Sequence, residues 1–529
     1  MKPVKPYYAM TPPGFISLAP ELIHAVADEL LVGDLKELRL TCRQLGYLLS
    51  AQVLRKLVFD FNFSNLETSV EKLEILSKGC PAAAQGIREL VLRSLSVDSN
   101  RIPNEHHTPE PSLFDSVLQK YLFRALSSLK SVRSVRWFSS ESDSDWIQTT
   151  VVAALTELPN LTRISIDIRY WKTALPIRNL QGLTEIALSG RCNSANCYEA
   201  TIDNIAKLIT RSPRLSSLSV EPWREYYGPI KNWSLQDLLQ GFPSNNPPLP
   251  LTRLRLCGAV VSLDSATLSH LRHLVSLDLQ DVCNLDDTSA FSKEFTSSPR
   301  DDIWAALLAS GIWLEKIKVD FITESFLEYL ASYSGLKALC VIPANFQDDA
   351  SSDEMAVKFF GPALLSHLQS LEWLEILPQN KGRWCFSSKN ASFITNFEEL
   401  SRLHMTVTTA NLNIDKDQKN IVELFINTAV GNLPRLENLD ISAALPRRRG
   451  VPRCGFGLAR LSRSTYQTMV KEVEKYRAPQ AFSRLPLLMA SRTLFEQEIF
   501  SMGLRSGHRA LRYTQVARED YPEEEKWEL

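Results

Sequence analysis

The apolar residues of this chain recur in one short pattern: apolar, two residues of any kind, apolar, one of any kind, apolar. Twelve copies of the pattern begin at Ile87, Val132, Leu161, Leu183, Leu215, Leu251, Leu274, Leu314, Leu336, Leu371, Leu400 and Leu436. Side chains of a strand alternate between its two faces, so the second and third apolar positions of each copy lie on the same face. The pattern therefore predicts twelve short strands that share one buried face.

Helix-like segments separate many of these strands. The starts of successive copies lie 22 to 45 residues apart. Amphipathic spacing predicts helices over residues 145–158, 199–211, 303–310, 324–333, 354–368 and 420–433. Pro159, Pro213 and Pro434 follow three of these segments closely, as expected where a helix ends before the next strand.

A strand and a helix repeated at this period resemble the leucine-rich repeat. The resemblance implies an α/β fold, an irregular solenoid with a curved parallel sheet and its helices outside, in which stacking buries what one unit cannot. The asparagine that usually follows the strand is replaced, for example by Arg169, Ala259 and Thr408. A doubly wound α/β domain is the alternative, but it does not require twelve copies of one spacing, and the chain has no glycine-rich phosphate loop.

Residues 15–61 predict three short amphipathic helices ahead of the repeats. Pro20 and Glu21 are typical of a first helical turn, so the first helix begins near Pro20. Gly33 breaks this helix, and Asp34 is a suitable cap for the second. The third is expected over residues 44–57. About 45 residues have little interior in which to bury their leucines, so the unit needs a partner surface, either the repeats that follow or another protein.

The order of residues in this segment resembles the F-box motif. The match rests on Leu18, Pro20–Glu21–Leu22–Ile23, Asp34–Leu35, Leu38, Thr41–Cys42–Arg43 and Leu45. Ala19 separates the leucine from the proline, and Gly46–Tyr47 stands where a tryptophan is common. The resemblance implies docking on a Skp-type adaptor, and through it on a cullin-RING ubiquitin ligase. The contact residues that it implies are Leu18, Pro20, Glu21, Leu22, Ile23, Val26, Leu30, Leu35, Leu38, Cys42 and Leu45.

The strand positions between the buried ones face the concave side of the expected solenoid, and most of them are polar. Cys340, Ile342, Trp373 and Leu377 are the exception, because they place apolar side chains on two consecutive units. We interpret them as an exposed anchor for a protein substrate, since tryptophan-centred apolar surface is typical of binding hot spots. Alternatively, another part of the chain, such as the carboxy-terminal segment, covers them.

Composition limits the class of protein. The chain has 529 residues, 44% apolar, with a net charge of −1, and is too long for one compact core. It has no apolar run long enough to span a membrane, and residues 1–14, expected to be flexible, lack the apolar core of a signal peptide. We therefore expect a cytoplasmic or nuclear protein. Its nine cysteines are an odd number, with only Cys192 and Cys197 close together, and indicate neither a disulfide framework nor a zinc site.

The carboxy-terminal segment, residues 446–529, differs in charge from the solenoid expected over residues 62–445. Residues 446–512 carry 14 Lys and Arg against four Glu, whereas residues 513–529 carry two against six acidic residues. The basic part is expected to pack on the acidic body or to meet an acidic partner. Its helix-like stretches, residues 464–476 and 491–502, suit a terminal cap. The arginines at 447–449 and 453 are also compatible with nuclear import or nucleic-acid contact, but no aromatic residues interleave them, so we do not expect nucleic-acid binding.

Catalytic motifs are absent from the sequence: it has no GxSxG, Walker loop, HExxH or Cys-x-x-Cys. We interpret His106–His107 as solvated loop residues, and Asp348, Asp349, Asp353 and Glu354 as a solvated acidic turn and helix start, rather than as metal ligands. We therefore expect a non-catalytic protein with no cofactor and no metal. The expected function is that of a substrate receptor for a Skp-cullin-F-box ligase with an unknown protein substrate; the alternative is a scaffold whose helices only cap the solenoid.

Overall fold

The computed structural model describes most of the chain. The described residues are 15–30, 32–61, 65–93, 95, 111–139, 143–171, 173–192, 194–224, 233–242, 247–281, 301–343, 346, 348–378, 381–408, 420–444, 456–479, 482–501 and 509–517. The expected flexible residues 1–14, the His106–His107 pair and the arginines at 447–449 and 453 lie outside them. The chain divides into two compact units, residues 1–228 with 237–247, and residues 229–236 with 248–529.

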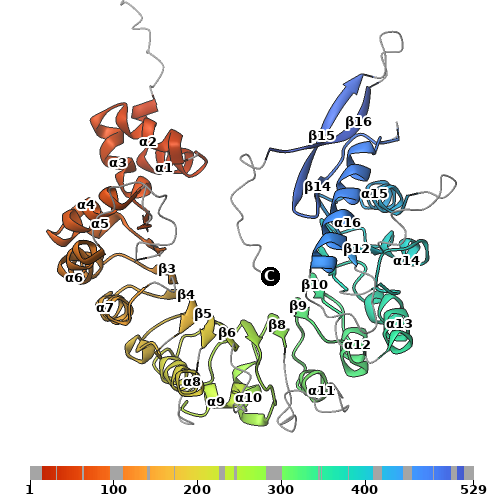
Figure 1. Ribbon diagram of the computed structural model, residues 1–529, viewed down its shortest axis with the longest axis horizontal. Coiled ribbons are helices and arrows are strands. Elements are labelled where there is room, and N and C mark those ends of the chain that lie inside the picture. Colours follow the sequence, from red (N-terminus) through yellow and green to blue (C-terminus); the bar gives the residue numbers. More distant parts are fainter. Residues whose placement is uncertain are drawn as a thin grey trace, which may run out of the picture. The chain divides into compact units, whose positions relative to one another are not determined.

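In the first unit, six parallel strands follow one another in chain order (Figure 1). They are β1 (Lys56–Phe59), β2 (Glu89–Leu92), β3 (Ser134–Ser139), β4 (Arg163–Trp171), β5 (Glu185–Cys192) and β6 (Ser217–Arg224). The α-helices that accompany them are α4 (Leu66–Ser77), α5 (Pro81–Gly86), α6 (Pro111–Ser127), α7 (Asp145–Thr156) and α8 (Ala195–Thr210), with the 3-10 turn η4 (Ile177–Asn179). The helices lie along one side of the strands.

The second unit continues the same plan and ends in an antiparallel meander. Its parallel strands are β7 (Arg253–Cys257), β8 (Ser276–Gln280), β9 (Lys316–Val319), β10 (Ala338–Val341), β11 (Trp373–Ile376), β12 (Arg402–Thr408), β13 (Asn438–Ala444) and β14 (Leu487–Ala490); β15 (Thr493–Ser501) and β16 (Arg509–Gln515) are antiparallel. The helices are α10 (Ser265–His270), α11 (Asp301–Ala309), α12 (Glu324–Ala331), α13 (Asp349–Lys358), η5 (Phe359–Ala363), α14 (Ser388–Ile394), α15 (Ile421–Asn432) and α16 (Phe456–Lys475), and α9 (Leu235–Leu239) precedes β7 in the chain.

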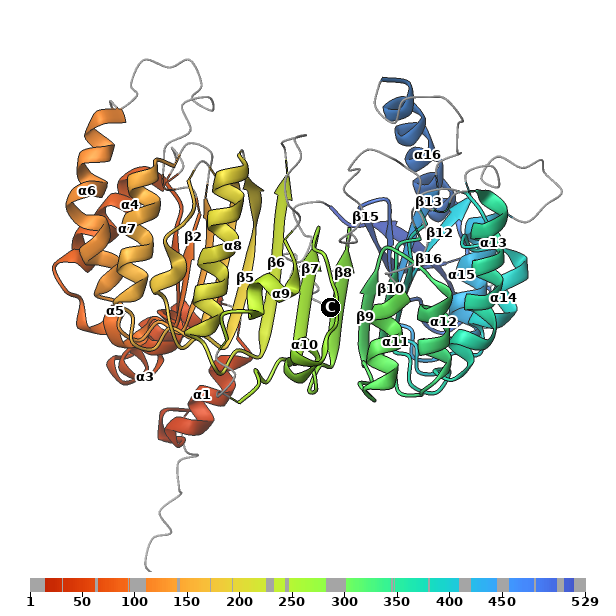
Figure 2. The same ribbon diagram turned by 90° about the horizontal axis from the view of Figure 1, so that it is seen from below.

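The predicted repeat is confirmed, because each of the twelve copies overlaps one of the strands β2 to β13. In the second unit the central apolar residues pair from strand to strand: Leu254, Leu277, Ile317, Leu339, Leu374, Leu403 and Leu439. None of them is more than 4% exposed. Strands therefore bury one face against the helices, and Figure 2 shows the strands of each unit side by side in chain order. The fold is an α/β solenoid of the leucine-rich-repeat type.

Helix starts are fixed locally by capping side chains. Ser194 accepts a hydrogen bond from the amide of Cys197 at the start of α8, and Asp264, Thr323 and Asp348 cap α10, α12 and α13 in the same way. Such a cap satisfies an amide that the helix itself leaves without a partner. Each strand-to-helix turn capped in this way thus has a defined point at which the helix begins.

Three sequence predictions of element boundaries are wrong. The third amino-terminal helix, expected over residues 44–57, ends at Val53, and β1 follows it and pairs with β2. Gly33 lies inside the second helix instead of before it. Residues 491–502, expected to be helical, contain the whole of β15, where pairing with β14 and β16 holds the chain extended.

The helix expected over residues 354–368 also differs. It begins earlier, at Asp349, because Asp348 caps it, and its regular part ends at Lys358. Pro362 and the non-helical backbone of Gly361 then interrupt it within η5. Proline removes a helical hydrogen bond, which explains the break.

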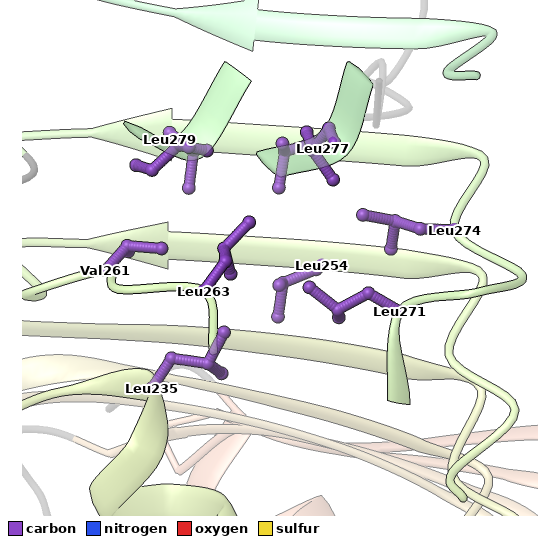
Figure 3. Close-up of a pocket in the computed structure, with 10 residues that line it drawn as sticks. Leu235, Leu254, Val261, Leu263, Leu271, Leu274, Leu277 and Leu279 are labelled. Atoms are coloured by element: carbon purple, nitrogen blue, oxygen red, sulfur yellow. The ribbon is translucent and has the colours of Figure 1, made fainter. Parts of the chain in front are cut away.

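An apolar cavity in the second unit holds too little space for a ligand. It measures about 10 Å³ and lies among the leucines of β7, β8 and their connecting segments, whose side chains point toward one another (Figure 3). A single water needs about 10–15 Å³ and several polar partners. The cavity is therefore a packing void of the core. Among the described residues, no helix is both long and apolar enough to cross a bilayer.

Candidate functional site

The amino-terminal helices form a small module with a core of its own. They are α1 (Pro20–Asp28), α2 (Val32–Leu40) and α3 (Arg43–Val53), preceded by the 3-10 turn η1 (Phe15–Ser17). The core consists of Ile23, Ala27, Leu35, Leu45 and Leu49, each at most 7% exposed. Because these side chains bury one another, the module does not need the solenoid to cover its apolar interior.

Gln52 ties α1 to α3 through polar contacts. Its side-chain amide donates to the carbonyl of His24 at 3.2 Å and to Oδ1 of Asp28 at 3.0 Å. Its Oε1 lies 3.1 Å from Nδ1 of His24. The module also touches the first repeats, since α3 packs against α5. The orientation of α1 on α3 is thus fixed by hydrogen bonds as well as by the core.

Large apolar side chains remain on the surface of this module. Leu22 is 55% exposed and Val26 is 42% exposed; they lie one turn apart on the same face of α1. Leu40, at the end of α2, is 71% exposed, and Tyr47 on α3 is 85% exposed. This set, Leu22, Val26, Leu40 and Tyr47, is called the module surface below. The module therefore satisfies its interior and still presents apolar side chains to solvent.

The structure divides the predicted adaptor-contact residues into two groups. Pro20, Glu21, Leu22 and Val26 are exposed, whereas Ile23, Leu35 and Leu45 are buried in the module core. The others, Leu18, Leu30, Leu38 and Cys42, are partly buried and pack on that core. The sequence prediction did not include Leu40 and Tyr47; the only signal for Tyr47 was that Gly46–Tyr47 stands where a tryptophan is common in the motif that the segment resembles.

A second candidate surface lies on the side of the second unit's strands opposite the described helices (Figure 1), called the helix-free face below. Its strand positions align across neighbouring strands in rows. One row contains Arg255, Asp278, Lys318, Cys340, Glu375, His404, Asp440 and Met489, from β7 to β14. Side chains of opposite charge are therefore neighbours on β7 and β8, where Nε of Arg255 lies 3.3 Å from Oδ2 of Asp278.

Arg402 is the centre of a compact cluster on this face. Its Nη2 lies 3.0 Å from Oδ2 of Asp440 and 3.5 Å from Oε1 of Glu375, so one guanidinium serves two carboxylates. Its Cζ lies 4.4 Å from the centroid of the Trp373 ring. We call Trp373, Glu375, Arg402, His404 and Asp440 the Trp373 cluster. Stacking on the ring and pairing with two anions hold this arginine in one orientation.

His404 completes the cluster. Its Nε2 lies 2.6 Å from Oγ of Ser442, and its Nδ1 faces Oε1 of Glu375 at 3.9 Å and Oδ2 of Asp440 at 4.0 Å. Burial lowers the pKa of His404 against the opposing attraction of the two carboxylates. The imidazole is therefore neutral at neutral pH, and Arg402 is the cation of the cluster.

Burial also shifts the acidic groups of the row. It raises the pKa of Asp440, although His404 and Arg402 act in the opposite direction, and it raises the pKa of Asp278. Burial likewise raises the pKa of the Cys340 thiol well above its ordinary value. The row thus holds carboxylates in a partly desolvated site, where the loss of a neighbouring cation has a large effect.

The donor atoms of Glu375, His404 and Asp440 lie within 4.8 Å of one another, a separation compatible with metal ligation. However, the carboxylate oxygens that face His404 are the same ones that Arg402 contacts. The guanidinium therefore takes the cationic place in this cluster. The cluster is therefore a network of one cation and two carboxylates beside a neutral imidazole.

The residues of the predicted apolar anchor are less exposed and more polar in their surroundings than the sequence indicated. Cys340 is 1% exposed, and Ile342, Trp373 and Leu377 are partly buried rather than open. Arg402 stacks on the Trp373 ring. The prediction placed Trp373 on the helix-free face but missed the charged residues around it, because apolar character was its only criterion.

Comparisons with known proteins add little. No protein-family model and no curated protein matches the chain. Among solved structures, yeast Rad7 in complex with Elc1 matches at 14% identity and a TM-score of 0.35, over 82% of this chain and 90% of that one. A leucine-rich-repeat protein of Leptospira interrogans matches at 12% identity and a TM-score of 0.24, over 77% of this chain and 98% of that one. Neither superposition is close enough to support an inference.

Proposed function

We propose that this protein is a non-catalytic substrate receptor of a Skp-cullin-F-box ubiquitin ligase, located in the cytoplasm, the nucleus or both. In this proposal, α1 to α3 dock on a Skp-type adaptor, and the solenoid holds a protein target. The observation that supports it is that Leu22 and Val26 are exposed on α1, the helix that carries the motif's Pro20–Glu21 start, although the module has a complete core. Exposed apolar side chains on a stable module are typical of a docking surface.

Binding to a purified Skp-type adaptor tests the first half of the proposal. We expect the full chain to bind and Leu22→Ala with Val26→Ala to weaken binding at least about tenfold, because both changes remove apolar area from the contact. Leu365→Ala is the matched control, since Leu365 is a comparably exposed leucine (53%) on the solenoid. Equal affinity of wild type and the double variant would contradict docking through this face.

The Trp373 cluster is the proposed centre of target recognition. Tryptophan and arginine are enriched among residues that dominate binding energy, and here they are stacked and held by two carboxylates before any partner arrives. Proteins that co-purify with wild type under blocked ligase activity are compared with those that co-purify with Trp373→Ala, Leu377→Ala. A correctly folded double variant that retains every partner would refute this assignment.

A ligase-independent scaffold is the second candidate. The packing of α3 on α5 supports this candidate, because a subdomain that caps the solenoid would contact its first repeats in this way. If the protein is a scaffold, the wild-type chain should not bind the adaptor. Deletion of residues 15–53 should then lower the stability of the solenoid, with no ligase contact to lose. The adaptor measurement therefore separates the two candidates.

A further inference from the structure

The helix-free face carries a group of cations on β7 and β9. The row that contains Arg255 and Lys318 has a neighbouring row, in which Arg253 aligns with Lys316 through Ser276 of β8. Both rows lie on the same face, because side chains two residues apart on a strand point to the same side. The four cations, Arg253, Arg255, Lys316 and Lys318, are called the basic patch below.

Acidic side chains of the described chain offset only part of this charge. Asp278 lies on β8, between the two basic strands, with its Oδ2 3.3 Å from Nε of Arg255. Asp320 follows β9, where its Oδ2 accepts a backbone amide hydrogen at 2.7 Å. Lys316 and Lys318 are partly exposed, and their side chains form no ion pair or hydrogen bond with the described residues. Cations this close together repel one another, so a negatively charged ligand stabilises the patch.

The sequence that follows β16 has the opposite charge. Residues 518–529 lie outside the described part of the chain, and their sequence contains five Glu and one Asp against one Arg and one Lys. They are called the acidic segment below. A tethered ligand reaches an effective concentration in the millimolar range when its tether spans the gap, so this segment has an advantage over acidic segments of other proteins.

The acidic segment is long enough to reach the basic patch. β16 ends at Gln515, which pairs with Phe495 of β15. The register of the intervening strands connects that pair to Ile317, which lies between the two lysines of the patch, so the chain leaves the sheet at the level of the patch. Seven strand spacings of about 4.8 Å separate β16 from β9, or about 34 Å along the sheet. Twelve extended residues span about 40 Å, and the direct path is shorter because the strands of this unit follow a curve with the helix-free face inside (Figure 1).

We propose that the acidic segment, residues 518–529, binds the basic patch of the same molecule and shields it from acidic segments of other proteins. Its carboxylates pair with Lys316 and Lys318. Surface ion pairs contribute little each and weaken with salt, so the contact depends on several pairs together and opens reversibly. The contact does not require adaptor binding, so its failure leaves the proposed function untouched. A target with an acidic stretch has to displace the segment, a consequence that rests on the proposed function.

Zero-length cross-linking of the full chain tests the contact without a variant. A carbodiimide joins a carboxylate to a lysine amine when the two groups are in contact. Trypsin then releases the acidic segment as peptide 519–526, linked to a patch lysine in peptide 301–318 or 317–337. Lys389 is the matched control, because it is an exposed lysine of the same unit on α14. In the monomer fraction we expect at least about ten times more cross-link to the patch than to Lys389, and at least about fivefold less when NaCl is raised from about 50 to about 500 mM. No cross-link at the patch, or an equal yield at Lys389, would overturn the proposal.

Binding of a separate peptide tests the charge complementarity. A synthetic peptide of residues 518–529 should bind the chain that lacks these residues, and Lys316→Glu with Lys318→Glu should weaken this binding at least about tenfold. Lys381→Glu with Lys389→Glu changes two exposed lysines outside the patch and should leave binding unchanged. Equal binding by the two double variants would refute the assignment; if the patch variant does not fold, the cross-linking of the wild-type chain still decides.

An unrelated glutamate-rich peptide tests whether the patch is shielded. It should bind the chain that lacks residues 518–529 at least about ten times more tightly than the full chain, because the tethered segment competes for the same cations. Equal affinities would mean that the patch is open to an acidic partner in the full chain, and the proposed intramolecular contact would then be wrong.

Discussion

Arg402 lies over the face of Trp373, with its guanidinium carbon 4.4 Å from the ring centroid. These two side chains come from neighbouring strands and are register partners in the β11–β12 ladder. The guanidinium of Arg402 therefore stacks on the aromatic ring and pairs with the carboxylates of Asp440 and Glu375. This arrangement combines an aromatic contact with a charged network on the side of the strands opposite the described helices.

Replacing Trp373 by alanine should destabilise the second unit. The change removes the cation–π contact and a partly buried ring, together about 1–3 kcal/mol of the free energy of unfolding. Urea denaturation measures it. Trp373→Phe keeps a ring beneath the guanidinium and should recover more than half of the loss; equal losses for the two variants would show that the ring does not support Arg402.

Replacing Arg402 by methionine should be more damaging than removing the ring. Glu375 and Asp440 would then lie together in a partly desolvated site without a cation, which is expected to destabilise by about 3–5 kcal/mol near neutral pH. Denaturation midpoints at pH 5 and pH 7 check the cause, because burial raises the pKa of Asp440 and its protonation should reduce the loss at the lower pH. A second change, Glu375→Gln, should also restore stability to Arg402→Met at pH 7.

The repeating part of the fold follows from a local signal. The pairs Leu374 with Ile376 and Leu403 with Met405 are spaced so that only a strand places both side chains on the buried face, and each strand of the repeat carries such a pair. The pattern depends on residues two apart in the chain, so a single sequence contains all of it. The twelve strands could be predicted for this reason.

The carboxy-terminal meander depends on a turn whose sequence is atypical. Ser491 and Arg492 join β14 to β15 with φ of 52° and 68°, the left-handed region that two-residue hairpins require and that Asn-Gly sequences usually provide. Without that turn signal, Phe495 and Ile499 are four residues apart and also fit a helix. Only pairing with β14 and β16 decides in favour of a strand.

The Trp373 cluster could not be predicted as a site because its parts are far apart in the chain. Glu375 and Asp440 belong to strands that are not neighbours in sequence, and only the β11–β12–β13 register brings them to one guanidinium. The same applies to the amino-terminal module, where packing decides that Ile23 is buried and Leu22 exposed. The spacing of apolar residues shows that a helix has an apolar side, but it does not show which of those side chains stay exposed to solvent.

Stability should fall in acid partly through His404. Its pKa is lowered in the folded protein, so below its ordinary value of 6.5 the unfolded chain takes up the proton more readily than the folded one. The stability contributed by the neutral imidazole is thus present above pH 6.5 and is lost as the pH falls. Asp440 has the opposite sign, because its raised pKa makes the folded state bind a proton more readily between the ordinary value of 3.8 and its own.

His404→Gln isolates the contribution of the imidazole. Plots of unfolding free energy against pH, from 5 to 7.5, should be flatter for this variant than for wild type, by up to about one bound proton. Other histidines contribute equally to both curves and cancel in the difference. A slope unaffected by His404→Gln would exclude this residue as the source.

Leu22 and Ile23, adjacent in α1, should separate binding from folding. Ile23 is fully buried in the module core, so Ile23→Ala should cost the module about 2–5 kcal/mol, whereas Leu22→Ala removes an exposed side chain and should change stability by less than about 0.5 kcal/mol. Hydrogen exchange of amides in residues 20–53 reports this local unfolding in the full chain. We expect faster exchange in α1 to α3 for Ile23→Ala, unchanged exchange for Leu22→Ala, and weaker adaptor binding for both. Fast exchange in Leu22→Ala would mean that its side chain supports the module's fold, and the loss of adaptor binding in that variant would then say nothing about the surface.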